Sequence, residues 1–373
     1  MKILFPFVGD SIGGSHISTI ELIRELKNKG VDVSIVLHVE NGPLSFFLNK
    51  QELSYSFVPA QKLAGEKPNI LHILIGIIRN FRRFRKYLIT NDIDIVHGND
   101  LRINLTWSIP TKLSNRFFIW HQRVYLSNSI LWNFISYLSH HFIAISQIVM
   151  DNAPANLKSS RKTVVWNPFN VNNKIDKDEA SNFLYKNYDI PKGCFLIGYV
   201  GRLVNYKKVD FLIDCIIELR KKNINTPIFL AIFGDGDSQY IDNLNKRIER
   251  NELKTQIKLF GFSYEPNIII SGFNLLVACS PRDAFGRSIV EAMLQETPVL
   301  AASAGGHLEI IENGITGILY ESKNCNDFID KLMQLILTQG KSKIPINAFT
   351  MAQNKFSAKT HVNKVLSIYH DLS

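Results

Sequence analysis

The chain has 373 residues, of which 46% are hydrophobic and 20% charged, so its composition is that of an ordinary globular protein and its length exceeds what one hydrophobic core usually serves. Lys and Arg outnumber Asp and Glu by 43 to 33, a net charge of +10 that favours anionic partners such as nucleotides, nucleic acid or an acidic lipid surface. The cysteines have wide spacing without a C-x-x-C pair, which argues against a zinc site or a disulfide framework and fits a cytoplasmic protein: they are Cys194, Cys215, Cys279 and Cys325.

The first half of the chain alternates short apolar runs with helical patterns. We expect strands over residues 2–8, 32–38, 94–97 and 118–121, and a helix over residues 17–29. Strands that alternate with helices predict a parallel sheet built from βαβ units. Residues 126–145 contain no Asp, Glu, Lys or Arg, but their Asn, Ser and His residues indicate a buried helix running into a strand rather than a membrane span.

The same alternation starts again in the second half. We expect strands over residues 195–200, 228–233, 257–260 and 275–278, with helices over residues 210–222 and 239–251. The final segment, residues 358–372, has apolar side chains at roughly helical spacing and is predicted to be a closing helix.

These elements predict two α/β, doubly wound, Rossmann-like domains. The first covers residues 1–172 and the second residues 193–355, with residues 173–192, rich in Asn, Lys and Asp, as a linker that carries a connecting helix. The closing helix, residues 356–373, can pack back on the N-terminal domain. Because ligands of such folds bind outside the carboxyl ends of the strands, we expect a site in a cleft between the domains.

A glycine loop follows the first expected strand. Gly14 is followed by Ser15 where a Walker motif requires lysine, so an NTPase is not expected. Backbone N–H groups at Gly13 and Gly14, before a helix, could meet an anion, and a tight turn without a ligand is the alternative. Two D-x-D triplets, residues 92–94 and 235–237, are common strings at a strand entry and in a glycine-rich turn, and we expect no metal at either.

A second loop places two cations after the strand at residues 195–200. Arg202 and Lys207 lie between this strand and the following helix, at a position that suits a diphosphate. A guanidinium offers two parallel donors and an ammonium a mobile charge, so together they could neutralise a leaving group without metal. A solvated basic turn is the alternative.

The segment after the strand at residues 275–278 carries two carboxylates. Asp283 and Glu291 are separated by seven residues across a junction from loop to helix. One carboxylate could accept hydrogen bonds from sugar hydroxyls, the helix-start N–H groups could bind phosphate, and the other carboxylate could accept from ribose hydroxyls. The spacing alone proves little.

At this segment the chain resembles a known family. Residues 283–319 look like the signature of the retaining GT-B glycosyltransferases of group 1, or GT4, through Phe285-Gly286, Glu291-Ala292-Met293, Thr297-Pro298-Val299, Gly305-Gly306, Glu309, Gly314 and Gly317. Other motifs of that family match Gly13-Gly14, Gly201-Arg202-Leu203, Lys207 and Gly234-Asp235-Gly236. The similarity is strong over residues 198–320 and weaker over residues 1–170.

The resemblance implies a GT-B fold, with the two domains facing a central cleft, and a role for each matching residue. Arg202 and Lys207 would bind the donor diphosphate, Asp283 the donor sugar and Glu291 the ribose, while His121 matches a cleft histidine near the transferred sugar. A lone histidine that ends an apolar strand is otherwise often a core residue. Further donor-binding positions would be Gly13, Gly14, Gly234, Phe285, Gly286, Arg287 and Ser288.

The sequence departs from the family pattern at three places. Asp283 replaces a usual Glu and shortens the reach by one methylene, which leaves the donor sugar open. Lys208 replaces a usual Gly and could alter the phosphate turn, and Gln295-Glu296 replace a small residue followed by Gly.

The first half carries most of the basic surplus, with 19 Lys and Arg against 11 Asp and Glu in residues 1–170. Residues 69–88 combine a long apolar run with five cations, a pattern typical of a helix that lies on an anionic membrane, although a packed helix with a solvated basic face is the alternative. The cations are Arg79, Arg82, Arg83, Arg85 and Lys86. Nucleic acid is not expected, because no recognition motif accompanies them.

Together these features predict a retaining, metal-independent glycosyltransferase without a cofactor. It would use a UDP- or GDP-sugar and a glycan or polyprenyl-linked acceptor in bacterial surface polysaccharide synthesis, as a cytoplasmic protein, with peripheral attachment to the inner face of the membrane left open. A GT-B-fold nucleotide-sugar epimerase or hydrolase and a catalytically silent carbohydrate-binding subunit remain as alternatives.

Overall fold

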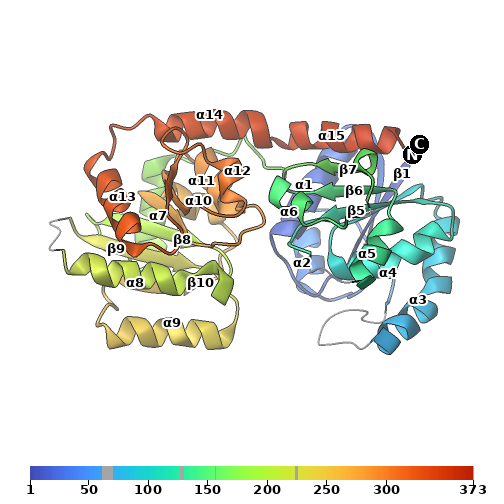
Figure 1. Ribbon diagram of the computed structural model, residues 1–373, viewed down its shortest axis with the longest axis horizontal. Helices are drawn as coiled ribbons and strands as arrows, with labels where there is room; N and C mark the ends of the chain where they lie inside the picture. The colour runs from blue at the N-terminus through green and yellow to red at the C-terminus, as the bar shows by residue number, and fades with distance from the viewer. Residues whose placement is uncertain (61–69, 127–129, 156, 223–225, 373) are drawn as a thin grey trace. The chain divides into compact units, whose positions relative to one another are not determined.

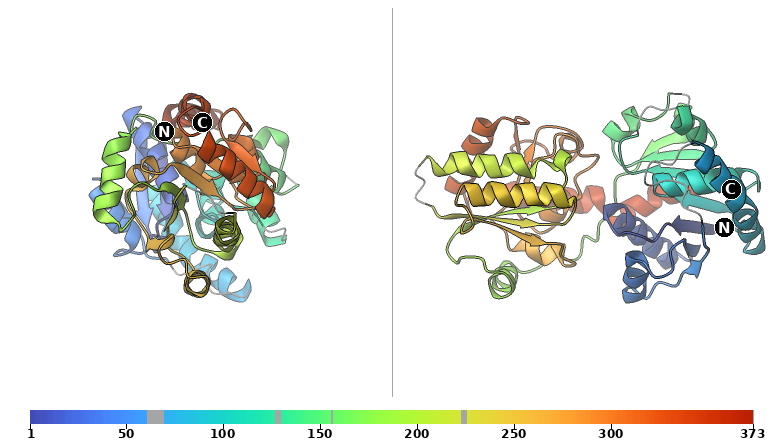
Figure 2. Two further views of the ribbon diagram at one scale, coloured as in Figure 1. Left: turned by 90° about the vertical axis from the view of Figure 1, so that its left-hand side faces the viewer. Right: turned by 90° about the horizontal axis from the view of Figure 1, so that it is seen from below.

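The computed structural model describes residues 1–60, 70–126, 130–155, 157–222 and 226–372. The chain forms two compact units (Figure 1). Unit 1 consists of Met1–Phe169 together with Ala358–Ser373, and unit 2 of Asn170–Ser357. Within each unit, helices lie on both faces of a parallel sheet (Figure 2). The expectation of two doubly wound α/β domains is confirmed.

Unit 1 contains a seven-stranded sheet. Its strands are β1 (Lys2–Phe7), β2 (Asp32–Leu37), β3 (Ser56–Phe57), β4 (Ile95–Gly98), β5 (Phe117–Gln122), β6 (His141–Ala144) and β7 (Lys162–Val164). They lie in the order β3-β2-β1-β4-β5-β6-β7, and every neighbouring pair is parallel. Helices cover both faces of β1, which explains why its sequence is apolar almost throughout.

The helices of unit 1 come from both ends of the chain. They are α1 (Gly14–Asn28), α2 (Pro43–Lys50), α3 (Ile70–Thr90), α4 (Leu101–Lys112), α5 (Ile130–Tyr137), α6 (Gln147–Asp151) and α15 (Ala358–His370), with a 3-10 turn, η1, at Ser159–Arg161. α15 packs against α1, and its Val362, Val365 and Tyr369 are buried in the same core as Ile3 and Phe5. The last helix of the chain therefore completes the core of unit 1.

Unit 2 contains a six-stranded sheet. Its strands are β8 (Phe195–Val200), β9 (Ile228–Phe233), β10 (Ile257–Gly261), β11 (Leu275–Ala278), β12 (Val299–Ala302) and β13 (Ile318–Tyr320). They lie in the order β10-β9-β8-β11-β12-β13, again with parallel neighbours only. Gly198 of β8 has no room for a side chain, because a Cβ there would lie 1.9 Å from Cδ2 of Phe273.

Two groups of helices cover the sheet of unit 2. They are α7 (Lys177–Asn187), α8 (Val209–Arg220), α9 (Ser238–Arg250), α10 (Pro266–Ser271), α11 (Arg287–Leu294), α12 (His307–Ile310), α13 (Cys325–Leu337) and α14 (Ile344–Phe356), with a 3-10 turn, η2, at Asn205–Lys207. α8 contacts α9 and α13, whereas α10 contacts α7 and α11, and α11 contacts α14.

The segment expected to be a linker, residues 173–192, belongs to unit 2. It contains α7, whose Leu184 is buried, and which packs against α10. Lys177 donates hydrogen bonds of 2.8 Å to the carbonyl oxygen of Ser271 and to the hydroxyl of Thr297. The connecting helix is therefore part of the second fold, and the chain passes between the units at Phe169–Asn170 and Ser357–Ala358.

The uncharged segment at residues 126–145 forms α5 and β6, with residues 127–129 outside the described part. A helix and a strand are confirmed, but the helix is not buried throughout, since Ile130 is 88% and Phe134 57% exposed. No helix in the described residues has the length and apolar character needed to cross a bilayer.

Candidate active site

The loop after β8 carries the two cations of the predicted phosphate site. Arg202 is exposed, and its Nη2 donates a 3.2 Å hydrogen bond to the hydroxyl of Tyr206. The hydroxyl of Tyr199 donates to the carbonyl oxygen of Arg202 at 3.1 Å, and that of Ser280 to the carbonyl oxygen of Tyr206 at 3.1 Å. The loop is thus held both from its own strand and from the end of β11.

The loop after β9 is hydrogen-bonded to the loop that carries Arg202 and Lys207. Leu203 forms two backbone hydrogen bonds of 2.9 Å, donating to the carbonyl oxygen of Asp235 and accepting from the N–H of Asp237. A Cβ at Gly234 would lie 1.9 Å from the carbonyl oxygen of Gly201, so only glycine fits there. Gly234, a predicted donor-binding residue, therefore has a definite local task, which is the close approach of two loops.

Lys207, Asp283 and His307 form a cluster in unit 2. Lys207 Nζ lies 2.6 Å from Oδ2 of Asp283, and Nε2 of His307 lies 3.7 Å from the same oxygen. His307 is fully buried, and its Nδ1 lies 3.0 Å from the carbonyl oxygen of Ala302. These groups come from the carboxyl ends of β8, β11 and β12, so the topology brings three distant segments together.

The Asp283 carboxylate is kept ionised by its neighbours. Burial by itself would raise the pKa of Asp283, but the ammonium group of Lys207 and the nearby His307 ring outweigh burial and hold this pKa well below its usual value. An ionised carboxylate accepts hydrogen bonds from hydroxyl groups. The cluster is therefore suited to hold a polyhydroxy ligand.

The start of α11 lies a few residues after Asp283 in the chain. Gly286 precedes the helix with a φ of +107°, a backbone conformation that favours glycine, and Phe285 beside it is buried. Nη2 of Arg287 lies 3.1 Å from Oε1 of Glu291, one turn further along. Ser288 lies in the first turn, where backbone N–H groups point out of a helix end and attract anions.

Two further glycines allow this segment to approach the loop after β12. A Cβ at Gly305 would lie 2.7 Å from the carbonyl oxygen of Asp283, and one at Gly306 would lie 2.7 Å from Cα of Phe285. The N–H of Gly306 also donates a 2.8 Å hydrogen bond to the carbonyl oxygen of Asp283. The glycine pair thus positions both Asp283 and the adjacent His307.

Two departures from the family pattern fall at left-handed backbone positions. Lys208 has φ +57° at the start of α8, and Glu296 has φ +50° after α11. Both stand where the family usually has Gly, and each has a backbone conformation that residues with side chains rarely adopt. That Lys208 alters the phosphate turn stays a prediction. Gln295 donates its amide to the carbonyl oxygen of Asn173 at 2.8 Å.

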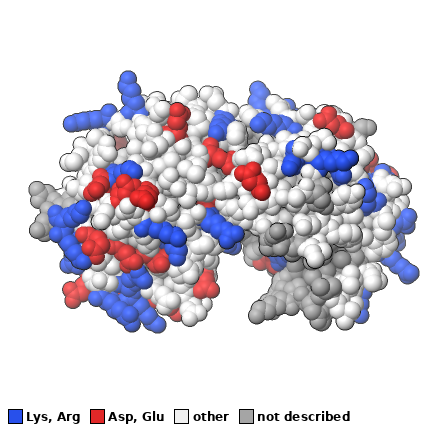
Figure 3. All heavy atoms as spheres, viewed as in Figure 1, with Lys and Arg blue, Asp and Glu red and all other residues white. Residues whose placement is uncertain are grey.

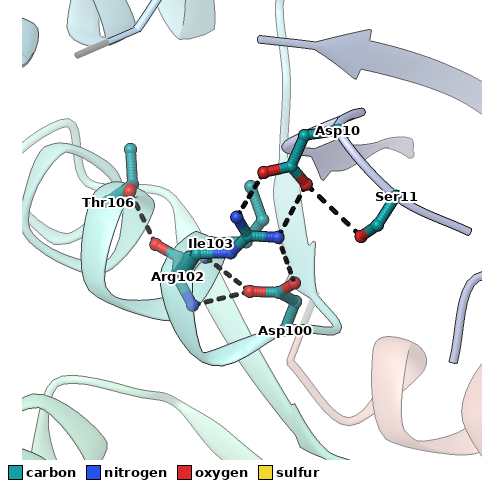
Figure 4. A network of polar contacts seen from close by, with 6 residues as sticks. All are labelled: Asp10, Ser11, Asp100, Arg102, Ile103 and Thr106. Carbon is teal, nitrogen blue, oxygen red and sulfur yellow. Dashed lines mark hydrogen bonds and ion pairs between the residues drawn. The ribbon is translucent and has the colours of Figure 1, made fainter. Parts of the chain in front are cut away.

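In unit 1, the loop after β1 is held by an ion-pair network (Figure 4). Arg102 donates two hydrogen bonds to Asp10, of 2.6 and 2.9 Å, and its guanidinium also lies 3.8 Å from Asp100, the cap of α4. These bonds lower the pKa of Asp10. Gly13 and Gly14 follow in the same loop, with Gly13 as the cap of α1.

His121 lies in the interior of unit 1, where it is 1% exposed. Its Nδ1 lies 3.1 Å from Nε2 of His97 and 3.4 Å from Nη2 of Arg123. Burial first, and then the charge of Arg123, hold the pKa of His121 well below its usual value, so the ring is neutral at pH 7.

The D-x-D carboxylates have local partners instead of forming a cluster. Asp237 caps α9 by accepting from the N–H of Tyr240, and Asp94 lies 3.7 Å from Arg116. Among the described residues, no group of three or more His, Cys, Asp or Glu side chains is arranged to hold a metal ion.

The basic residues of α3 lie at an exposed face, whereas Asn69 lies outside the described residues. Phe84 and Leu88 are fully buried, and Phe84 stacks on Trp107 with ring centroids 4.3 Å apart. The five cations Arg79, Arg82, Arg83, Arg85 and Lys86 are all exposed. Figure 3 shows Lys and Arg side chains along the edge where Figure 1 places α3.

Comparison with known families decides the assignment. The model for glycosyl transferases group 1 matches residues 182–349, and the model for Glycosyltransferase Family 4 matches residues 12–173. The two matches cover both units. The chain belongs to the group 1 (GT4) glycosyltransferases.

Known glycosyltransferases are similar to this chain over different shares of its length. Poly(ribitol-phosphate) alpha-N-acetylglucosaminyltransferase of Staphylococcus aureus is 32% identical over 184 residues, which are 48% of this chain and 36% of that protein. An uncharacterized glycosyltransferase of Methanocaldococcus jannaschii is 28% identical over 368 residues, 96% of this chain and 90% of that protein. The crystal structure of HepE of Anabaena in complex with UDP and glucose has a TM-score of 0.84 at 22% identity over 99% of both chains, a likeness that shows the GT-B fold.

In this glycosyltransferase, some of the predicted site residues are in direct contact with one another, and some contact residues that were not predicted. Lys207 and Asp283 are in direct contact, whereas Arg202 and Glu291 each contact a different neighbour, Tyr206 and Arg287. The sequence analysis missed His307, whose place directly after Gly305-Gly306 was a usable signal. In unit 1 it missed His97, which lies in β4 beside the strand that carries His121.

Proposed function

We propose that this glycosyltransferase transfers a sugar from a UDP- or GDP-sugar to a glycan or polyprenyl-linked acceptor, with retention of configuration and without a metal. Surface polysaccharide synthesis is the proposed setting, because a relative acts on poly(ribitol phosphate). The observation that carries the proposal is the contact between Lys207 and Asp283, beside the exposed Arg202. It supports the proposal because cations suited to a diphosphate and a carboxylate suited to sugar hydroxyls lie in adjoining loops.

The proposed chemistry follows from the charges of these groups. Negative charge develops on the departing diphosphate, and Arg202, Lys207 and the N–H groups at the start of α11 would stabilise it. Lys207 has three N–H donors, so it can retain Asp283 while it also binds a phosphate oxygen. Asp283 would accept hydrogen bonds from the donor sugar, and Glu291 from the ribose, in place of its present bond from Arg287.

In unit 1, His121 would contact the transferred sugar, and Gly13-Gly14 would approach the diphosphate. These two roles, together with retention, rest on the family alone. No side chain is proposed as a nucleophile. Catalysis would therefore consist of positioning and of electrostatic stabilisation of the leaving group.

The experiment is a turnover assay with UDP-, GDP-, ADP- and TDP-sugars, with and without glycan and lipid-linked acceptors, in buffer and in EDTA. Glycosylated acceptor and free nucleoside diphosphate should appear together and persist in EDTA. Release of nucleoside diphosphate without an acceptor would instead identify a hydrolase, and isomerised donor an epimerase. Donor binding without any turnover would identify a silent subunit, and activity restored only by Mn²⁺ or Mg²⁺ would contradict the metal-free mechanism.

We also propose that α3 attaches unit 1 to an anionic membrane. Its exposed apolar residues, Leu71, Leu74, Ile75 and Ile78, follow one another at helical spacing. At 100° per residue, Arg82, Arg85 and Lys86 continue the same face, opposite the buried Phe84 and Leu88.

One face of α3 thus carries both apolar side chains that could insert into a membrane and cations that anionic lipids would attract. The apolar half would enter the boundary between headgroups and acyl chains, and the basic half would contact anionic headgroups. In the described part of the chain, none of Arg82, Arg85 and Lys86 forms an ion pair. An anionic lipid surface supplies the complementary charge and lies where a polyprenyl-linked acceptor would be.

A further inference from the structure

Tyr206 lies in the loop after β8, and its side chain contacts both cations of the proposed phosphate site. Its hydroxyl oxygen accepts the 3.2 Å hydrogen bond from Nη2 of Arg202. Nζ of Lys207 lies 5.7 Å from the centre of its ring. The roles proposed above for Arg202 and Lys207 do not include this tyrosine, so its contribution to the site is open.

The loop holds the backbone of Tyr206 and leaves the side chain at the surface. The residue belongs to the turn η2, and its carbonyl oxygen accepts a 3.1 Å hydrogen bond from the hydroxyl of Ser280. The carbonyl oxygen of Arg202 accepts a bond of the same length, 3.1 Å, from the hydroxyl of Tyr199. Tyr206 is 42% exposed and Arg202 is exposed too, so a ligand can reach both side chains from solvent.

The hydrogen bond between Arg202 and Tyr206 can have only one direction. A guanidinium has five N–H donors and no acceptor, so the hydroxyl must accept. A phenolic hydroxyl can donate at the same time, and the bond from Arg202 is the only one that it forms with the described residues. The hydroxyls of Tyr199 and Ser280, in contrast, already donate to carbonyl oxygens of the loop. The Tyr206 O–H therefore remains available to a ligand.

The charges beside this hydroxyl favour an anionic ligand. Lys207 forms an ion pair with Asp283, whereas Arg202 has no carboxylate partner among the described residues. An anion that pairs with Arg202 would bring an oxygen close to the Tyr206 O–H, because Nη2 and the hydroxyl oxygen are only 3.2 Å apart. A phosphate group has several acceptor oxygens and can bind both donors at once.

We propose that Tyr206 is a further residue of the diphosphate site, whose hydroxyl donates a hydrogen bond to a phosphate oxygen while it accepts one from Arg202. The inference rests on the proposed function for the identity of the ligand, a nucleoside diphosphate. The bond from the guanidinium polarises the O–H and makes the hydroxyl a stronger donor. Tyr206 thereby adds a neutral donor to the two cations.

The test measures the binding of inorganic pyrophosphate, which has two phosphate groups but neither nucleoside nor sugar. Titration calorimetry of the full-length protein in metal-free buffer compares the parent with Tyr206→Phe, which keeps the ring beside Lys207 and removes only the hydroxyl. We expect the affinity to fall about tenfold, the value of one hydrogen bond to a charged group.

Tyr185→Phe is the matched control for this titration. Tyr185 lies on α7, and Nζ of Lys192 is 5.8 Å from the centre of its ring, so the same substitution is made beside another lysine of unit 2. This variant should bind pyrophosphate as tightly as the parent does.

A crystal structure of the parent with pyrophosphate separates direct contact from an effect through Arg202. We expect a phosphate oxygen within about 3.2 Å of the Tyr206 hydroxyl oxygen. A phosphate that contacts Arg202 but lies beyond hydrogen-bond distance of Tyr206 would overturn the inference. Equal affinities of the parent and Tyr206→Phe, equal losses in Tyr206→Phe and Tyr185→Phe, or no binding of pyrophosphate by the parent would do the same.

These measurements do not depend on the proposed reaction. If no sugar donor is turned over but Tyr206→Phe still weakens pyrophosphate binding, the proposed function is wrong and the contact of Tyr206 with a diphosphate stands. If donors are turned over and Tyr206→Phe binds pyrophosphate like the parent, the inference is wrong and the proposed function stands.

Discussion

Lys207 Nζ and Asp283 Oδ2 lie 2.6 Å apart although 76 residues separate them in the chain. Their loops follow β8 and β11, which are neighbours in the sheet of unit 2. The ion pair therefore joins the proposed phosphate loop to the proposed sugar loop before any ligand is bound. A donor that enters would find both groups already in position, which lowers the entropic cost of assembling the site.

Arg202→Ala and Lys207→Ala should each lower kcat about a hundredfold to a thousandfold. Each removes a positive group from a leaving group whose charge grows in the transition state, a loss of roughly 2.7–4 kcal/mol. Steady-state kinetics with the established donor give the measurement. Lys221→Ala removes a cation after α8 that donates to Glu218 at 2.7 Å and serves as the control. Normal turnover of both test variants would refute the phosphate assignment.

Glu291→Ala should weaken the binding of nucleoside diphosphate and leave kcat nearly unchanged. Ribose hydroxyls do not change during transfer, so a contact to them stabilises the ground state and the transition state equally. Titration calorimetry measures the affinity, with the exposed Glu312→Ala as the matched control. Equal affinities of parent and Glu291→Ala would exclude the ribose role.

The contribution of Asp283 to stability should depend on pH. Its pKa is lower in the folded than in the unfolded protein, so the ionised group stabilises the fold above the ordinary pKa of Asp, about 3.9, and this stabilisation is lost as pH falls below it. Asp283→Asn should therefore lower Tm most near pH 7, and by less at about pH 3.5. Asp242→Asn, at an exposed position, is the control. A difference in Tm that stays constant with pH would contradict the assignment.

Lys208→Gly should raise the free energy of unfolding by up to about 1 kcal/mol. It relieves the left-handed conformation at φ +57°, which costs about 1–2 kcal/mol, and part of this gain is lost to the greater freedom of glycine in the unfolded chain. Lys221→Gly, at φ −70° after α8, should instead lower stability. Urea unfolding of both variants measures the free energy of unfolding. If both variants lose a similar amount of stability, Lys208 is not strained.

Replacing Arg82, Arg85 and Lys86 with Gln should lower binding to anionic vesicles about a hundredfold, since each cation near an acidic leaflet contributes about 1 kcal/mol. Co-sedimentation at low and high salt provides the measurement, and the attraction should weaken with salt. The matched control replaces three cations of unit 2, Lys246, Arg250 and Lys254. Equal binding to neutral and anionic vesicles, or equal losses in both variants, would refute the membrane role of α3.

The central strands could be predicted from sequence because a parallel strand buried on both faces is a continuous apolar run. The runs at residues 195–200 and 228–233 coincide with β8 and β9. β3 and β7 could not be predicted, because they have only two and three residues, too few to show a period. Residues 173–192 were predicted to be a linker with a connecting helix, but the polar surface of that helix, α7, gave no sign that its buried Ala180 and Leu184 pack it against α10.

The residues of the candidate site also divide into those that the sequence predicts and those that it does not. Arg202, Lys207 and Asp283 could be placed because each follows a recognisable strand, and loops at that end of a parallel sheet meet. His307 and His97 could not, since their importance depends on partners from other segments. The bond between His97 and Tyr369 joins residues 272 positions apart, a distance that no local pattern reports.

The chain crosses between the units twice, so unit 1 is built from two segments, Met1–Phe169 and Ala358–Ser373, that the ribosome makes at different times. A ribosome synthesises all of Asn170–Ser357 before it makes α15, so unit 1 still lacks a helix when the last residue of unit 2 has been added. Until then the apolar surface that Val362, Val365 and Ile368 will cover on α1 and the sheet stays open to water and to chaperones. The half of the protein that emerges first is thus the half that is completed last.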